Sequence, residues 1–149
     1  MKRVVISDTS CLIVLSKINQ LDILHSLFGE VWISEDVRNE FGEDLPHWFI
    51  IKKANSIQIE KILSLNLDKG EASAIALYLE QKENALLVID ERKGRKIAKE
   101  LGIKIIGTLG IIAKAKELGL ISDLQKTMKE LDKIDFRISL SIKQQMLGK

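Results

Sequence analysis

The sequence predicts a three-layer α/β/α fold built on a mostly parallel sheet. Two apolar runs, residues 4–7 and 86–89, are rich in Val, Ile and Leu, do not alternate with polar residues, and are each followed by an aspartate. Such runs are typical of strands that are buried on both faces of a parallel sheet. Helical patterns separate the predicted strands, which implies right-handed crossovers with helices on both faces of the sheet.

The other elements follow from local signals along the chain. Ser34 and the two acids after it form a good helix start, and Gly29 is a common residue just past a helix end. The predicted strands lie at residues 4–7, 31–33, 49–51, 86–89 and 104–106. The predicted helices lie at residues 10–17, 21–28, 56–65, 70–81 and 108–118. One further helix begins after residue 34, another follows the strand that ends at Asp90 and runs to residue 101, and the tail from residue 122 is also expected to be helical.

Composition is that of an ordinary globular protein. The chain has 149 residues, of which 46% are hydrophobic and 30% charged, and its net charge of +2 gives no argument about nucleic acid. No Pro/Gly/Ser-rich linker interrupts the chain, so residues 1–149 are expected to form a single domain. No apolar stretch approaches the roughly 20 residues of a membrane span, and we expect a cytoplasmic protein without a membrane partner. The single cysteine, Cys11, excludes an internal disulfide and is expected to be a small buried residue.

Four acids are candidates for one site. Asp8 and Asp90 follow apolar strands, and the carboxyl ends of strands are where open α/β sheets bind ligands. Glu40 lies at the edge of the sheet-facing side of its helix, and Glu71 lies in the first turn of another helix, on its buried stripe. Taken singly, the aspartates could be helix caps, Glu71 could stabilise a helix dipole, and Glu40 could be solvated. Four carboxylates at one sheet edge would instead repel each other unless a divalent cation were bound.

The order of these motifs resembles the PIN-domain family. The motifs are Asp-Thr-Ser at 8–10, Val-Arg-Asn-Glu at 37–40, Lys-Gly-Glu-Ala at 69–72 and Val-Ile-Asp at 88–90. More narrowly, the chain is similar to a prokaryotic branch with a DTS start, a GEA-AIAL helix and a D-R-GR segment, and the similarity continues through residues 106–110 and 136–139. The resemblance covers nearly the whole chain. It implies strand order 3-2-1-4-5 and a magnesium- or manganese-dependent ribonuclease that is often the toxin of a toxin-antitoxin pair.

Carried over position by position, the resemblance assigns an acidic cluster that serves both as catalytic site and as metal ligands: Asp8, Glu40, Glu71 and Asp90. It also implies that Thr9 or Ser10 supports the metal site through a hydroxyl or a bound water. The implied cofactor is Mg²⁺ or Mn²⁺, and the implied partners are RNA, a cognate antitoxin protein and a second copy of the chain in a homodimer. Many relatives carry a fifth acid shortly after the fourth, where this chain offers only Glu91.

The residue types suit this chemistry. Mg²⁺ and Mn²⁺ prefer oxygen ligands, and Mg²⁺ takes one or two carboxylates directly while keeping several waters. An ion of this kind can orient a water, lower its pKa and neutralise charge on a phosphodiester. His25 and His47 are expected to be structural or surface residues, because an acid-cluster mechanism needs no histidine.

A basic stripe follows Asp90. Arg92 and Arg95 lie within about two helical turns of the predicted metal and are candidates for nucleic-acid binding through flanking phosphates, whereas Lys99 is expected to be solvated. No ladder of exposed aromatic residues is evident, so the sequence indicates no base preference.

Two alternatives remain at this point. A phosphotransfer enzyme or receiver domain also places aspartates at strand ends. The former usually has a second acid two residues after the first, where this chain has Ser10, and a receiver has a lysine where Ile106 leads into Gly107. The second alternative is a non-catalytic PIN-like module that binds RNA or a partner protein.

Overall fold

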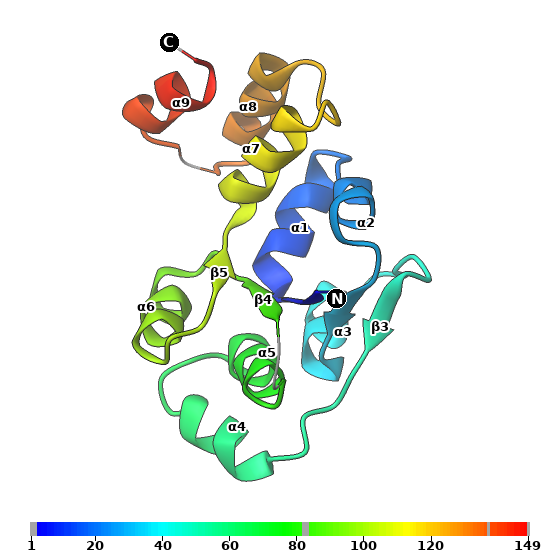
Figure 1. Cartoon of the computed structure of the whole chain (residues 1–149), viewed down its shortest axis with the longest axis vertical. Helices are drawn as coiled ribbons and strands as arrows, with labels where there is room; N and C mark the ends of the chain where they lie inside the picture. The colour runs from blue at the N-terminus through cyan, green and yellow to red at the C-terminus, as the bar shows by residue number, and fades with distance from the viewer. Residues whose placement is uncertain (1–2, 82–83, 137, 149) are drawn as a thin grey trace.

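The computed structural model of the chain describes residues 3–81, 84–136 and 138–148 and contains a five-stranded sheet in which every pair of neighbouring strands is parallel. The order is β3-β2-β1-β4-β5, as the resemblance implied (Figure 1). The strands are β1 (Val4–Ser7), β2 (Val31–Ile33), β3 (Phe49–Ile51), β4 (Ala85–Val88) and β5 (Ile105–Ile106). This order differs from the 2-1-3-4-5 order of flavodoxin-like sheets, the class that includes receiver domains.

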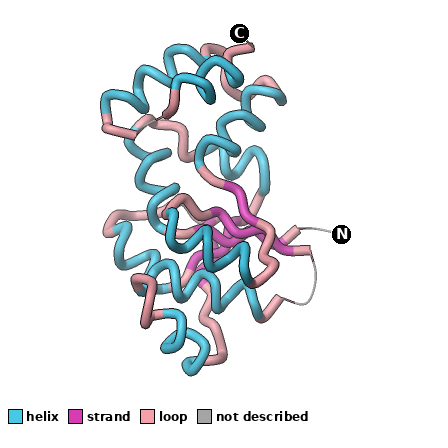
Figure 2. The backbone as a smooth tube through the Cα atoms, turned by 90° about the vertical axis from the view of Figure 1, so that its left-hand side faces the viewer, coloured by secondary structure: helices cyan, strands magenta, loops and turns pink. Residues whose placement is uncertain are grey.

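Helices lie on both sides of the strands, as Figure 2 shows. They are α1 (Thr9–Lys17), α2 (Asp22–Phe28), α3 (Glu35–Phe41), α4 (Ile57–Leu63), α5 (Lys69–Leu79), α6 (Arg92–Glu100), α7 (Thr108–Glu117), α8 (Leu124–Lys133) and α9 (Leu140–Met146). The predicted helices are confirmed to within a few residues at their ends, and the helical tail consists of α8 and α9.

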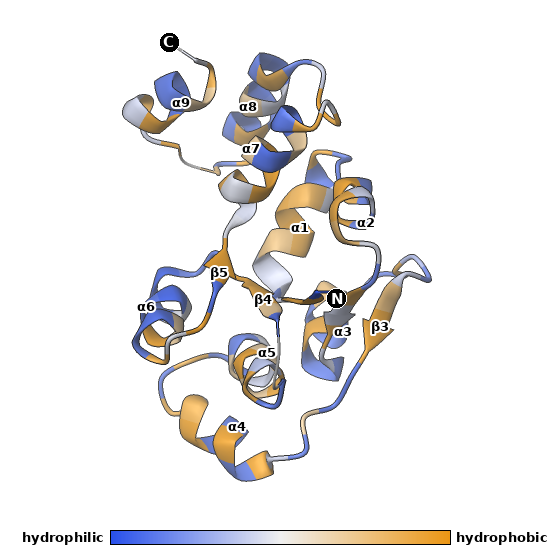
Figure 3. Ribbon diagram, viewed as in Figure 1, coloured by the Kyte–Doolittle hydropathy of each residue, from blue (hydrophilic) through white to orange (hydrophobic). Residues whose placement is uncertain are grey.

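The sheet has an apolar core on each face, which explains why its central strands do not alternate with polar residues. Val5, Leu86 and Val88 pack with residues of α1, α2, α7 and α8. Ile6 and Leu87 point to the other face and pack with residues of α5 and α6. Figure 3 shows that the strands are hydrophobic, while α6 is mostly hydrophilic. The central strands β1 and β4 are therefore held in place by apolar packing on both faces of the sheet.

A buried serine pair joins the two helices that carry the candidate glutamates. Ser34 Oγ lies 2.6 Å from Ser73 Oγ, and Ser73 donates to Gly70 O at 3.0 Å. Ser34 also accepts a bond from Val37 N at 3.1 Å, which confirms it as the N-cap of α3. These bonds fix α3 and α5 against each other at their first turns.

Among the described residues, no single helix is long and apolar enough to cross a membrane. Helices α1 and α2, which are separated by a sharp bend, reach the required length and apolar composition only when they are counted as one segment.

Candidate active site

Asp8 and Asp90 meet at the carboxyl end of the central strand pair. Asp8 follows β1 and is fully buried, and its Oδ1 accepts a bond from Cys11 N at 3.3 Å, which makes it the N-cap of α1. Its Oδ2 accepts a second bond from Asp90 N, also at 3.3 Å. The two aspartates predicted from the strand ends are therefore joined directly.

Thr108 holds the Asp90 carboxylate. Its backbone N–H donates to Asp90 Oδ1 at 2.7 Å, and its hydroxyl donates to Asp90 Oδ2. Gly107, the residue before α7, has no side chain to cap that helix, so Asp90 supplies the cap from a different strand. Sequence reasoning did not identify Thr108, because its partner is 18 residues away in the chain.

Glu71 brings a buried carboxylate to the same edge. It is only 6% exposed, and its Oε2 has no hydrogen-bond partner among the described residues. Burial raises its pKa to about 7, and the negative charge of Asp68 adds to the increase. Asp68 is the N-cap of α5 and accepts a bond from Glu71 N at 2.9 Å. The buried position predicted for Glu71 is correct, and Asp68 is a neighbouring acid that the sequence analysis missed.

Glu40 lies at the rim of the site, on an exposed part of α3. A Cβ at Gly70 would lie 2.5 Å from Glu40 Oε1 and 3.0 Å from Thr9 Oγ1, so the carboxylate and the hydroxyl both border this glycine. Desolvation raises the pKa of Glu40, as does the charge of Asp68, whereas Thr9 lowers it. Thr9 is buried and Ser10 is exposed, which favours Thr9 of the two predicted hydroxyls.

Two more glycines permit close contacts with the acids. A Cβ at Gly94 in α6 would lie 2.7 Å from Glu71 Oε2. A Cβ at Gly107 would lie 2.9 Å from Asp90 Oδ1 and 2.5 Å from Arg95 Nη1. Real Cβ atoms do not approach other atoms this closely, so a side chain at either position would force the neighbouring side chains to move. The glycines of the sequence motifs therefore make room for the carboxylates.

Electrostatics couple the acids. Burial raises the pKa of Asp8 to about 7, and the charges of Asp90 and Glu71 add to the increase, while the bonds from Cys11 N and Asp90 N lower it. Near neutral pH, the charged and the neutral forms of Asp8 are therefore both populated. A bound cation would favour the charged form.

A protein-family model for DUF3368, described as a PIN domain, matches residues 4–149. The chain belongs to the PIN-domain family. PIN domains are generally nucleases and typically use divalent metals. No curated protein and no solved structure matches the chain.

The donor atoms of this PIN domain fit a divalent cation. Within the described part of the chain, no three His, Cys, Asp or Glu side chains form a ready-made metal-binding group. Mg²⁺ nevertheless needs only one or two carboxylates, with waters filling the other positions. The unpartnered Glu71 Oε2 and the raised pKa of Asp8 both indicate carboxylates that lack a counter-charge.

Glu91 is the acid that directly follows Asp90. It is exposed and caps α6, and its Oε1 accepts a bond from Lys93 N at 3.3 Å. Its charge still contributes to the raised pKa of Glu71. One carboxylate oxygen of Glu91 is therefore engaged at the start of α6.

The basic stripe lies beside the acids. A cavity of about 360 Å³ is lined by Asp90, Arg92, Arg95, Lys96 and Lys99. Arg92 is exposed, whereas Arg95 is half-buried and its Nη1 donates to Ile89 O at 3.2 Å. The two arginines predicted to hold phosphates thus differ, because Arg92 is exposed whereas Arg95 is held by a backbone carbonyl.

The first prediction concerns stability and pH in the absence of metal. The pKa of Asp8 is raised from its ordinary value of 3.8 to about 7, so the folded protein binds the proton more tightly than the unfolded chain. Stability should therefore fall as pH rises from about 4 to 7. In chelator at pH 8, Asp8→Asn is expected to stabilise the protein by on the order of 1 kcal/mol, and this gain should disappear at pH 5.

Urea unfolding at both pH values measures this difference. Asp123→Asn is the matched control, because Asp123 caps α8 in the same way, by accepting a bond from Lys126 N, but is exposed. Equal destabilisation of both variants at both pH values would mean that Asp8 is only a helix cap.

The second prediction tests the close approach at Gly94. Gly94→Ala should displace the Glu71 carboxylate, weaken Mn²⁺ binding several-fold and cost about 1–3 kcal/mol of stability through overpacking. Gly110→Ala is the control, since Gly110 is also the third residue of its helix and its Cβ would meet Ile106 Cγ1 at the same 2.7 Å. The control should lose stability but keep its Mn²⁺ affinity. Thermal melts and Mn²⁺ titration separate the two effects, and an equal loss of Mn²⁺ affinity would contradict the proposed contact.

Proposed function

We propose that this PIN domain is a divalent-metal-dependent endoribonuclease that hydrolyses RNA phosphodiester bonds. The observation that carries the proposal is the hydrogen-bonded pair of aspartates at adjacent parallel strand ends, with the buried Glu71 charge coupled to Asp8. Asp8, Asp90 and Glu71 would hold Mg²⁺ or Mn²⁺, and Glu40 would complete the site at its rim. This arrangement agrees with membership of a family that consists generally of nucleases.

Each residue of the proposed site would have a separate role in the reaction. Thr108 occupies both oxygens of Asp90 and keeps that carboxylate from rotating. Glu40 is exposed and has a raised pKa, so it suits the acceptance of a proton from a water beside the Thr9 hydroxyl. When bound, the metal would lower the pKa of a water and neutralise charge that develops on the phosphodiester. Arg92 and Arg95 would hold the flanking phosphates.

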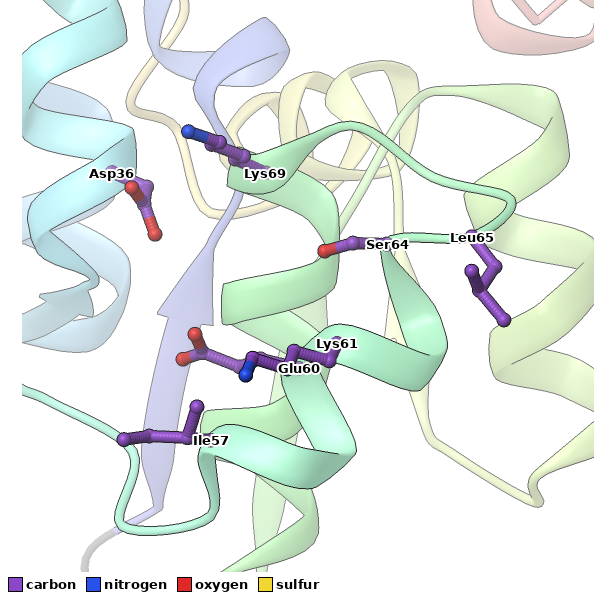
Figure 4. Close-up of a pocket in the computed structure, with 7 residues that line it drawn as sticks. All are labelled: Asp36, Ile57, Glu60, Lys61, Ser64, Leu65 and Lys69. Carbon is purple, nitrogen blue, oxygen red and sulfur yellow. The ribbon is translucent and has the colours of Figure 1, made fainter.

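The proposal extends to the toxin of a toxin-antitoxin pair, with a cognate antitoxin protein and a homodimer as partners. Support comes from three exposed apolar side chains on and after α4, since Ile57, Ile62 and Leu65 are 59%, 66% and 81% exposed. Large exposed apolar side chains that lie close together can mark protein interfaces. A cavity of about 460 Å³ adjoins these side chains, and Figure 4 shows the carboxylates of Asp36 and Glu60 directed into the cavity, with Leu65 turned away from them.

A second candidate is a non-catalytic PIN-like module that binds RNA or a partner protein. The observation in its favour is that the acids of the described residues do not form a group of three or more in metal-binding geometry. Under this alternative, RNA would bind beside α6 without being cleaved.

The third prediction separates these two functions. RNA cleavage should require Mg²⁺ or Mn²⁺ and should fall by at least about 100-fold in Asp8→Asn and in Asp90→Asn, because each variant removes a ligand charge. Asp123→Asn should cleave at the normal rate. A gel assay with labelled RNA, with and without chelator, measures the effect. Full-rate cleavage in excess chelator would exclude this mechanism, and RNA binding without any cleavage would favour the non-catalytic module.

The fourth prediction concerns the two arginines. Arg92→Ala and Arg95→Ala should each reduce the slope of log K for RNA against log salt by about one unit. Arg95→Ala should also tighten Mn²⁺ binding, because it removes a cation beside Asp90, whereas Arg92→Ala should not. Lys129→Ala on α8 is the control. Titration of RNA at several salt concentrations, and of Mn²⁺ separately, tests both points, and an unchanged slope would show that the stripe is only a solvated helix face.

A further inference from the structure

A second cavity shares Asp90 and Arg95 with the basic cavity beside α6. It measures about 530 Å³ and is lined by residues of β5, of the start of α7 and of α9, together with Phe136. Figure 1 shows where β5, α7 and α9 lie in the fold. The other lining residues of the cavity are Ile105, Ile106, Gly107, Leu109, Gly110, Phe136 and Ile142. We name it the Phe136 cleft. One cavity is therefore cationic and the other apolar, and the two meet at the candidate active site.

The lining of the Phe136 cleft suits a flat apolar group with a polar edge. Among the described residues that line it, Asp90 and Arg95 carry charge, and both lie at the end that it shares with the basic cavity. Phe136 is half-buried against the main core, and its backbone N–H donates to Leu131 O at 3.0 Å. The ring is thus anchored while part of it stays accessible.

Arg95 links the two cavities. Its Nη1 is held by Ile89 O, and the absence of a side chain at Gly107 leaves room for the guanidinium beside Asp90. A group bound in the Phe136 cleft would therefore lie next to the same guanidinium that borders the basic cavity. A ligand with an anionic part joined directly to a flat aromatic part would fill both.

We propose that the Phe136 cleft is a base-binding subsite for single-stranded RNA. A base stacks on Phe136 while the adjoining phosphate lies between Arg95 and the basic face of α6. Stacking of unpaired bases on aromatic side chains is the usual way in which proteins hold single-stranded RNA. This subsite rests on the proposed function for its substrate class, and it adds a base contact that composition and motifs did not reveal.

The test compares two labelled RNA octamers, oligo-uridine and an abasic octamer of the same length, by fluorescence anisotropy in chelator at low salt. The full-length protein should bind oligo-uridine about tenfold more tightly than the abasic octamer, because only the former can stack. Phe136→Leu should remove most of this difference by weakening oligo-uridine binding alone, and Phe136→Trp should retain it. Phe28→Leu is the matched control, since Phe28 is also half-buried against the same core.

A second variant guards against misfolding of Phe136→Leu. Ile142 is 40% exposed and lines the cleft, so Ile142→Ser should leave thermal stability nearly unchanged and weaken oligo-uridine binding a few-fold. If the wild type does not discriminate between the octamers, or if Phe136→Leu discriminates as well as the wild type, the subsite is wrong. Occupation of the cleft by a protein segment would give the same negative result.

Cleavage measured separately with Mn²⁺ distinguishes the two proposals. Base-dependent binding through Phe136 without cleavage would contradict the nuclease proposal and leave the subsite intact. Metal-dependent cleavage together with unchanged discrimination in Phe136→Leu would contradict the subsite alone.

Discussion

The backbone hydrogen bonds between β1 and β4 are the constraint on which the rest of the site depends. Their register pairs Ser7 with Val88, so the chain leaves both strands at the same edge, and Asp8 N continues the ladder by donating to Val88 O at 2.9 Å. Asp8 and Asp90 are brought together in this way despite a separation of 82 positions in the chain. The side chains of both strands are packed into the two cores, so a shift of register would disrupt that packing, and this holds the two acids in place.

The acids at this edge oppose the stability of the fold. Asp8 is fully buried and its pKa is raised to about 7, which means that its charged form is disfavoured in the absence of a cation. Natural proteins often retain such unfavourable groups at functional sites, where activity requires them. The surrounding residues limit the cost, because Cys11 N and Asp90 N both donate to Asp8, and Thr108 donates to Asp90.

Asp90 and Arg95 connect the parts of the molecule proposed to act on RNA. Asp90 caps α7 through Thr108, while Arg95 extends from α6 back to Ile89 O at the end of the central sheet. The two side chains line both the basic cavity and the Phe136 cleft. Under these proposals, a phosphate and its base would occupy separate neighbouring surfaces, one charged and one apolar.

The sequence by itself determined the strands, most helices and the buried position of Glu71, because periodicity and capping residues report local burial directly. Ser34 is a clear example, since its hydroxyl caps α3 as its pattern predicted. Only the tertiary structure showed that Thr108 holds Asp90 and that Phe136 and Arg95 line the same cleft. These contacts join segments that are distant in the chain, and they depend on how whole helices pack against the sheet, which no local pattern encodes.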